Sequence, residues 1–235
     1  MNLEFEYEYP KEVLNYIFVV DVSGSMWDKL GIINKAFEEV LWKLEQRMQK
    51  PQYDHEIRIA ILEFSTGARW INDSDCPKRV QGFYFTLHSG GKTELGEALT
   101  ELNRKLNNRY IFPRSPYNRF CYPSIIFITD GPPSDSWKEA LKELNENQWY
   151  KHAAKVAFAI DDADLDCLEQ VVGNREAVIT IRDMGQFEKV FKYIVSKLLP
   201  LKYSEPFVCN DAEMAEYEDL DEDMLFDWDD HDKDW

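Results

Sequence analysis

Residues 15–26 read NYIFVVDVSGSM, and this stretch decides the fold class. A short run of apolar, β-branched residues ends abruptly at Asp21, as a buried strand does when it reaches the edge of a sheet. A second run of this kind, PSIIFIT at 123–129, ends equally abruptly at Asp130. Between them, residues 31–48 place apolar side chains three and four positions apart, which predicts an amphipathic helix. Buried strands therefore alternate with helices.

The same alternation continues along the chain. Further strands are expected at 56–65, 80–87, 155–160 and 177–181, and further helices at 93–106, 136–148, 163–172 and 186–200. The segment at 80–87 contains Gly82, which favours a place at the sheet edge. Strands of near-continuous apolar residues between amphipathic helices predict an α/β fold, with a mostly parallel, six-stranded sheet and helices on both faces.

Charge divides the chain into unequal parts. Its 235 residues hold 44 acidic and 27 basic side chains, a formal net charge of −17, and residues 211–235 contain 13 of the acids against one lysine. So dense a block of like charge is typical of solvated, disordered segments. We interpret the chain as an N-terminal extension at 1–13, one domain at 14–200, and a linker with an acidic, aromatic-containing tail at 201–235.

Composition also excludes several classes of protein. No apolar run reaches the ~18 residues of a membrane span, and the acidic N-terminus lacks the pattern of a secretion signal. The predicted location is the cytoplasm, without a membrane. The four cysteines are 42 to 46 residues apart, which fits four reduced thiols better than a metal site or two disulfides. An acidic surface repels phosphates, so no direct binding of nucleic acid is expected.

Five oxygen-bearing side chains are expected at one edge of the sheet, because ligands of such folds bind beyond the carboxyl ends of the strands. Three come from D-V-S-G-S, one from G-G-K-T-E and one from T-D-G; they are Asp21, Ser23, Ser25, Thr93 and Asp130. Taken singly, each fits a loop or helix cap. Together they form a set of hard oxygen donors, which suits Mg²⁺ or Mn²⁺ and leaves a position for a partner's carboxylate.

These motifs resemble the metal-ion-dependent adhesion site of the von Willebrand factor A (VWA) domain. The matches are DVSGSM (21–26), GGKTELGEAL (90–99) and FITDGPPSDSWKEAL (127–141), and the resemblance covers about residues 14–199. It implies a Rossmann-like sheet with one antiparallel edge strand. It also implies that the three hydroxyls bind the ion directly, and that Asp21 and Asp130 do so directly or through water. Lys92 precedes Thr93 where the family has G-G-T; it either lengthens the loop or places a cation beside the site.

The resemblance extends to a subgroup and to the kind of partner. ITDGPPSDSW and AFAIDDADLDCL, at 128–137 and 157–168, are similar to the bacterial cytoplasmic VWA proteins of tellurium-resistance (TerY-like) gene clusters. Family members typically bind a partner protein, often through its Asp or Glu. The subgroup implies a stress-response or phage-defence system with kinase or phosphatase partners. The resulting prediction is a Mg²⁺-dependent interaction module that is not an enzyme.

A metal-dependent hydrolase or phosphatase that uses the same ion is the alternative. It needs a nucleophile with a paired base, and no His, Lys or Cys is obviously paired with Ser23 or Ser25. Of the four histidines only His88 is expected near the strand ends. The GGKT segment at 90–93 lacks the upstream glycine of a phosphate-binding loop.

The tail at 211–235 interleaves aromatic side chains with its acids, a pattern typical of segments that fold onto a basic or grooved partner. A solubilising tail is the simpler interpretation. A third possibility is mimicry of nucleic acid in a partner's basic groove. The metal site adds a sharper hypothesis, in which a tail Asp or Glu supplies the missing carboxylate. This predicts autoinhibition or self-association.

Overall fold

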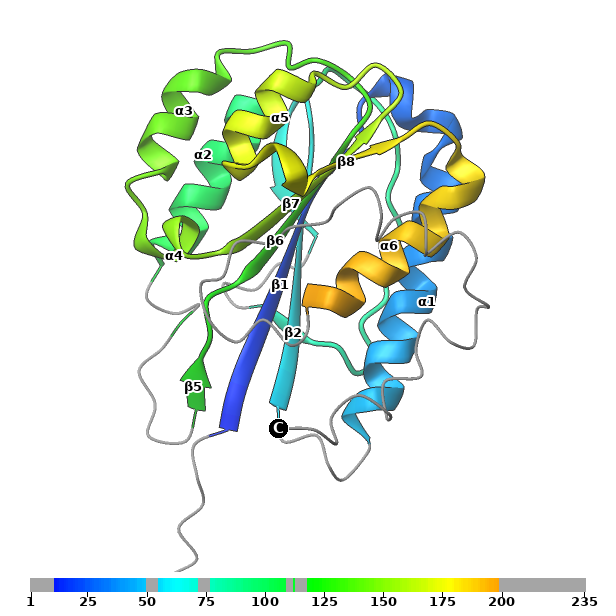
Figure 1. Cartoon of the computed structure of the whole chain (residues 1–235), viewed down its shortest axis with the longest axis vertical. Coiled ribbons are helices and arrows are strands. Elements are labelled where there is room, and N and C mark those ends of the chain that lie inside the picture. The colour runs from blue at the N-terminus through cyan, green and yellow to red at the C-terminus, as the bar shows by residue number, and fades with distance from the viewer. Residues whose placement is uncertain (1–10, 50–54, 72–76, 109–111, 113–117, 199–235) are drawn as a thin grey trace, which may run out of the picture.

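The computed structural model describes residues 11–49, 55–71, 77–108, 112 and 118–198, and one sheet with helices on both faces dominates it (Figure 1). Its strands are β1 (Lys11–Asp21), β2 (His55–Ser65), β3 (Gly67–Trp70), β4 (Lys78–Arg79), β5 (Asn118–Phe120), β6 (Ser124–Thr129), β7 (Ala154–Ile160) and β8 (Val178–Ile181). Its helices are α1 (Leu30–Met48), α2 (Leu95–Leu106), α3 (Trp137–Leu144), α4 (Gln148–Lys151), α5 (Leu165–Val172) and α6 (Met184–Leu198), with 3₁₀ turns η1 (Gly24–Asp28) and η2 (Arg175–Ala177). Among the helices in these ranges, none combines the length and apolarity that a membrane crossing requires.

The strand order is β3-β2-β1-β6-β7-β8, with β4 paired to β2 and β5 paired to β1. The central strand β1 runs parallel to β2, β5 and β6, and the parallel pairing continues to β7 and β8. At the other edge, β3 and β4 run antiparallel to β2. The expected mostly parallel, Rossmann-like sheet with an antiparallel edge is confirmed. The six predicted strands include one at 80–87 that the structure does not show, and they omit β3, β4 and β5.

Two layers of helices bury the sheet. In Figure 1, α1 and α6 cover one face, and α2, α3 and α5 cover the other. On the first face the rings of Phe18, Phe37 and Phe191 meet, with Phe37 edge-on to Phe18 at 4.8 Å and to Phe191 at 5.0 Å between ring centroids. On the second face Tyr150 is fully buried, and its hydroxyl donates to the backbone oxygen of Val171. Each face thus has its own apolar core.

The strand expected at 80–87 is wrong. Only Lys78–Arg79 pair with β2 in this region, and Gly82, with φ +68°, turns the chain just beyond them. Phe85 of this segment packs instead against α1, where its ring lies 5.2 Å from that of Phe37. Packing of apolar side chains on a helix therefore accounts for this segment without a ladder of backbone hydrogen bonds. The antiparallel edge belongs to the four-residue strand β3, which the sequence did not indicate.

Most other boundaries agree to within a few residues, with two informative exceptions. The strand β1 begins at Lys11, so it includes residues expected to lie in the extension at 1–13. The helix expected at 136–148 is interrupted: α3 ends at Leu144, and α4 starts anew after Asn147. The Asn147 side chain accepts a hydrogen bond from the backbone N–H of Trp149 at 2.9 Å, so a local cap restarts the helix.

Candidate metal centre

The carboxyl ends of β1 and β6 lie side by side at the upper edge of the sheet in Figure 1. Their last paired residues are Val20 and Ile128, so the two aspartates expected at the strand ends are brought together. Asp21 is fully buried and Asp130 is 5% exposed. Two carboxylates buried this close to each other call for compensation by donors or cations.

Asp21 organises the loop that follows it. Its Oδ1 accepts the backbone N–H of Ser23 at 2.8 Å, and its Oδ2 accepts the hydroxyl of Thr129 at 2.6 Å. Burial raises the pKa of Asp21, and the nearby charge of Asp130 adds to the rise, although the hydrogen bonds from Thr129 and Ser23 oppose it. The carboxylate is thus fixed in position but not fully compensated.

A row of oxygens leads from this carboxylate to the surface. The Oγ atoms of Ser23 and Ser25 are 3.1 Å apart, and the Ser25 hydroxyl donates to Asp130 Oδ1 at 2.7 Å. Ser23 is buried whereas Ser25 is exposed. The D-x-S-x-S segment therefore presents both hydroxyls toward Asp130, with an opening to solvent at Ser25.

The loop that carries Thr93 is tied to this segment through the backbone. Gly24 N–H donates to the oxygen of Gly91 at 3.1 Å, and Gly90 N–H donates to the oxygen of Val22 at 2.7 Å. Gly91 has φ +91°, and a Cβ there would lie 2.8 Å from the Thr66 hydroxyl. Only glycine fits both the conformation and the space.

Thr93 itself is half-buried, and it lines a small cavity together with Thr129 of β6. Its backbone oxygen accepts the N–H of Ser134 at 2.8 Å. Lys92, the departure from the family pattern, is exposed, and its N–H donates to the Thr66 hydroxyl at 3.2 Å. The structure thus brings the Thr93 loop to the same edge as the other four expected ligands.

Three residues at this edge were missed by the sequence analysis. Thr129 donates to Asp21, and Lys29 forms ion pairs with Asp130 Oδ2 at 3.0 Å and with Asp161 Oδ2 at 3.1 Å. Asp161 follows β7 directly, so it repeats the strand-then-aspartate signal and could have been found by it. Thr129 precedes Asp130 in T-D-G, but only structure shows its contact with Asp21. Lys29 has no comparable sequence signal.

Within the described ranges, no group of three or more His, Cys, Asp or Glu side chains could hold a metal ion. The candidate centre therefore depends on hydroxyl oxygens beside two carboxylates. Around Mg²⁺, with Mg–O distances of ~2.1 Å, adjacent oxygens of an octahedron lie about 2.9 Å apart. The Ser23 and Ser25 hydroxyl oxygens, 3.1 Å apart, are close enough to take two adjacent positions. The residues present fit a small, oxygen-preferring divalent cation.

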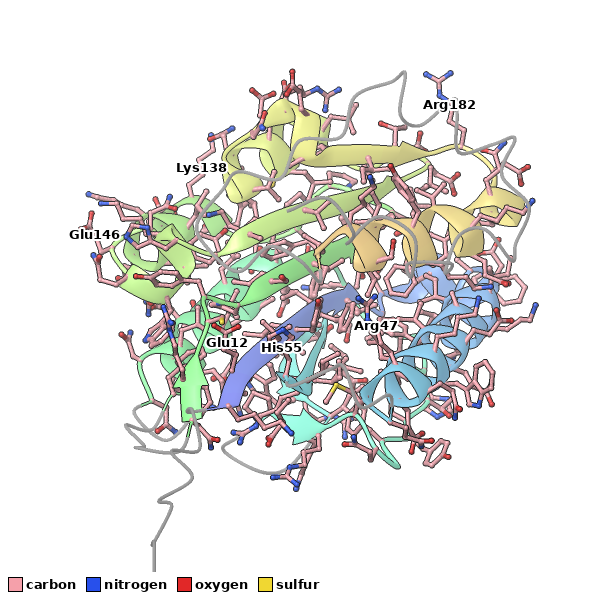
Figure 2. The ribbon with its side chains drawn as sticks, turned by 60° about the horizontal axis from the view of Figure 1, so that its bottom comes forward. Glu12, Arg47, His55, Lys138, Glu146 and Arg182 are labelled. Carbon is pink, nitrogen blue, oxygen red and sulfur yellow. The ribbon has the colours of Figure 1, made fainter. Side chains whose placement is uncertain are left out.

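The described histidines have other surroundings. Glu12 and His55 lie side by side at the amino ends of β1 and β2, at the opposite edge of the sheet, with 3.4 Å between Nδ1 and the carboxylate (Figure 2). The His152 ring lies 4.9 Å from that of Tyr122. His88 is exposed in the loop before Gly90. His231 lies outside the described residues.

The cysteines in the described ranges, Cys121 and Cys167, are free and buried. Burial raises the pKa of Cys167 to about 12, so this thiol does not ionise near neutral pH. For these two residues the expected reduced thiols agree with the structure. Cys76 and Cys209 lie outside the described residues, where reduced thiols remain a prediction.

Residues 15–193 match the model of the von Willebrand factor type A domain, and the chain belongs to this family. Domains of the family are typically protein-interaction modules with a metal-ion-dependent adhesion site. The match spans all five expected ligands. A comparison with curated proteins finds no match.

Solved structures share the fold at low sequence identity. A von Willebrand factor type A protein from Catenulispora acidiphila has a TM-score of 0.56 at 18% identity, covering 81% of this chain and 43% of its own. Proximal thread matrix protein 1 from the mussel byssus, with zinc in its metal-ion-dependent adhesion site motif, also has 0.56 at 18%, covering 84% and 48%. The pilus adhesin SpaC from Lactobacillus rhamnosus GG has 0.61 at 11%, covering 82% and 31%. The chain thus spans less than half the length of each.

Proposed function

We propose that this protein is a divalent-cation-dependent protein-interaction module that binds a partner through its Asp or Glu. Asp21, Ser23, Ser25, Thr93 and Asp130 would hold the ion, which when bound supplies an electrophilic position for the partner's carboxylate. The observation that carries the proposal is the gathering of the Ser23 and Ser25 hydroxyls, 3.1 Å apart, beside the buried carboxylates of Asp21 and Asp130. Hard oxygen donors favour Mg²⁺ or Mn²⁺. Zinc in the corresponding motif of the mussel protein supports a divalent ion.

The surface around the opening supports a protein as the partner. Trp27 lies in η1, two residues after Ser25, and is 74% exposed. Exposed tryptophan is costly to leave in water and is enriched at the energetic centres of protein interfaces. A partner that brings a carboxylate to the ion would cover this ring. Trp27→Ala is therefore expected to weaken partner binding without changing ion binding.

The proposal does not include catalysis. Within the part of the chain that the structure describes, the Ser25 hydroxyl forms hydrogen bonds with Ser23 and Asp130, and the histidines there have other surroundings. A hydrolase would need a base free to take a proton, whereas Lys29 already neutralises Asp130. Turnover of phosphoesters that depends on Mg²⁺ or Mn²⁺ would contradict this part of the proposal and favour the hydrolase.

The biological setting follows from the resemblance to tellurium-resistance proteins. ITDGPPSDSW at 128–137 contains Asp130, so the segment that suggests the subgroup also contributes a residue to the proposed site. The proposed partners are a kinase or phosphatase of the same cytoplasmic stress-response or phage-defence system.

Affinity capture from the cytosol of the source organism tests the proposal. Wild type and Asp21→Asn are used as bait, each with Mg²⁺ and with chelator. Asn keeps the shape of Asp21 and its acceptor for Ser23 N–H, so the variant is expected to fold. A partner retained only by wild type with Mg²⁺ is expected. A partner retained in all four conditions would contradict a metal-bridged interaction.

The tail at 201–235 lies outside the described residues, so its role remains a prediction. If a tail Asp or Glu competes for the ion, deletion of 211–235 raises the affinity for the captured partner, because a tethered ligand acts at millimolar effective concentration. Unchanged affinity would contradict autoinhibition. Weaker affinity would instead make the tail part of the docking surface.

A further inference from the structure

Lys29 reaches into the proposed ion site from the junction between η1 and α1. Its side chain is only 12% exposed. The ammonium contacts Asp130 Oδ2 at 3.0 Å and Asp161 Oδ2 at 3.1 Å, and it donates to the Ser25 backbone oxygen at 3.1 Å. A fourth oxygen, Asp28 Oδ1, lies at 3.4 Å, so oxygens from η1 and from the ends of β6 and β7 hold the Lys29 ammonium in one place.

These contacts change what Asp130 can offer to an ion. Its Oδ1 accepts the Ser25 hydroxyl, and its Oδ2 is taken by Lys29. The side chain is 1% exposed, so water does not replace either contact easily. Direct coordination by Asp130 would require a cation to displace the Lys29 ammonium or to share Oδ2 with it, and two cations at one oxygen repel.

We propose that Lys29 is a positioning residue that holds Asp130 back from direct coordination, so that a partner's carboxylate completes the shell of the ion. The inference rests on the proposed function and deepens it. A charge fixed within a few ångströms of the ion lowers the affinity of the site for the metal alone. The partner's carboxylate takes the coordination position that Asp130 does not take, which makes ion binding and partner binding mutually dependent.

Asp161 supports this arrangement from the neighbouring strand end. It has φ +47°, a left-handed conformation that few residues other than glycine adopt. In this conformation its carboxylate meets Lys29, so the ammonium has a second anion and does not depend on Asp130 alone.

Lys29→Met tests the inference, with Lys35→Met as the matched control. Lys35 is also on α1 and paired with carboxylates, but it is exposed and contacts Glu188 and Glu39 instead of the site. Three quantities are measured on each full-length variant: Mn²⁺ affinity from the spectrum of free Mn²⁺, the relaxation of water protons by bound Mn²⁺, and the melting temperature without metal.

For Lys29→Met we expect Mn²⁺ binding at least about tenfold tighter than in wild type, because a neighbouring positive charge is gone. Relaxation per bound Mn²⁺ is expected to fall, because Asp130 replaces one coordinated water. The metal-free melting temperature is expected to fall, because Asp130 loses its counter-charge. A merely structural role would lower both stability and ion affinity, whereas positioning changes them in opposite directions. Lys35→Met should match wild type in Mn²⁺ affinity and relaxation.

Two results would overturn the inference. If wild type binds Mn²⁺ but a folded Lys29→Met variant binds it no more tightly, the role of Lys29 is refuted and the proposed ion site still stands. Absence of Mn²⁺ binding in wild type refutes the proposed site and the inference together. If Lys29→Met does not fold, Lys29→Gln provides the same comparison, since an amide can keep a hydrogen bond to Asp130 without the charge.

Discussion

Lysines bridge carboxylates in two clusters of this protein, and the electrostatic setting of the two clusters differs. Lys192 contacts Glu39 and Glu188 where α6 packs on α1, and Lys35 contacts the same two glutamates from the outside. Two bases and two acids balance there. Lys29 makes the corresponding bridge at the carboxyl edge of the sheet.

The cluster around Lys29 is not balanced. Asp28, Asp130 and Asp161 lie close to this one lysine, and Asp21 is near enough to Asp130 to feel its charge, so these named groups have three more negative charges than positive ones. Hydroxyl groups stand beside the acids, whereas the α1–α6 cluster shows none among its contacts. The cluster whose charges balance links α1 to α6. The cluster with excess negative charge, which lies beside hard oxygen donors, favours the binding of a cation. The following predictions test this difference.

The largest expected effect comes from breaking the balanced cluster. Lys192 is 5% exposed on its side chain, so Lys192→Met leaves two partly buried glutamates with only the exposed Lys35. The free energy of unfolding should fall by about 3 kcal/mol, as when one partner of a buried ion pair is removed. Urea denaturation measures the loss. Lys35→Met is the control and should change stability little. A Lys192→Met variant as stable as wild type would contradict a structural role.

Adding metal should affect the unbalanced cluster alone. At a Mg²⁺ concentration of 100 times the dissociation constant, wild type should gain about 2.7 kcal/mol of stability, and a tenfold weaker site would gain about 1.4 kcal/mol. Ser25→Ala removes one proposed ligand and should show the smaller gain. Ser136→Ala removes an exposed serine that makes no cap hydrogen bond and should show the full gain. Equal gains in the two variants would exclude Ser25 as a ligand.

Two glycine substitutions compare the loop that carries Thr93 with a turn outside the proposed ion site. Gly91→Ala places a Cβ against Thr66 at φ +91°, and should cost about 2 kcal/mol and weaken ion binding. Gly173→Ala, at the end of α5, has φ +81° but open space around the new Cβ. It should cost about 1 kcal/mol and leave ion binding unchanged. Thermal melts with and without Mg²⁺ separate the two effects; unchanged ion binding in Gly91→Ala would show that this loop does not shape the site.

The smallest effect concerns pH. Burial would raise the pKa of Glu188, but hydrogen bonds from Lys192 and Lys35 outweigh it and lower the pKa from 4.5 to about 2. A lowered carboxyl pKa stabilises the fold fully above pH 4.5, and this stability is lost as pH falls toward 2. Glu188→Gln should therefore differ from wild type by up to about 1 kcal/mol at pH 6 and less at pH 3. A difference that grows on acidification would contradict this sign.

The sequence predicted the parts of the molecule that depend on strong local patterns. Continuous apolar runs identified β1, β6 and β7, and apolar spacing identified α1 and α6. The strand predicted at 80–87 was wrong because a short run of apolar and aromatic residues suits packing on a helix as well as pairing in a sheet. The strand β3 was missed because four residues, Gly67–Trp70, are too few to show a period.

The candidate site divides in the same way. Strand-end position and residue type predicted Asp21 and Asp130, and the same signal after β7 would have pointed to Asp161. No local pattern could reveal that Lys29, which precedes α1, meets Asp130 and Asp161 at the ends of β6 and β7, because these contacts join segments about 100 and 130 residues apart. The two strand-end carboxylates were thus predictable, and their counter-charge was not.

The central claim is that the unbalanced cluster binds one divalent cation. Calorimetric titration of the full chain with Mn²⁺ tests it directly, with Asp21→Asn as the variant and Glu188→Gln, in the balanced cluster, as the matched control for a lost carboxylate. The account predicts one ion per chain in wild type and in Glu188→Gln, and none in Asp21→Asn. Binding that is absent from wild type, or equal in Asp21→Asn, would contradict it.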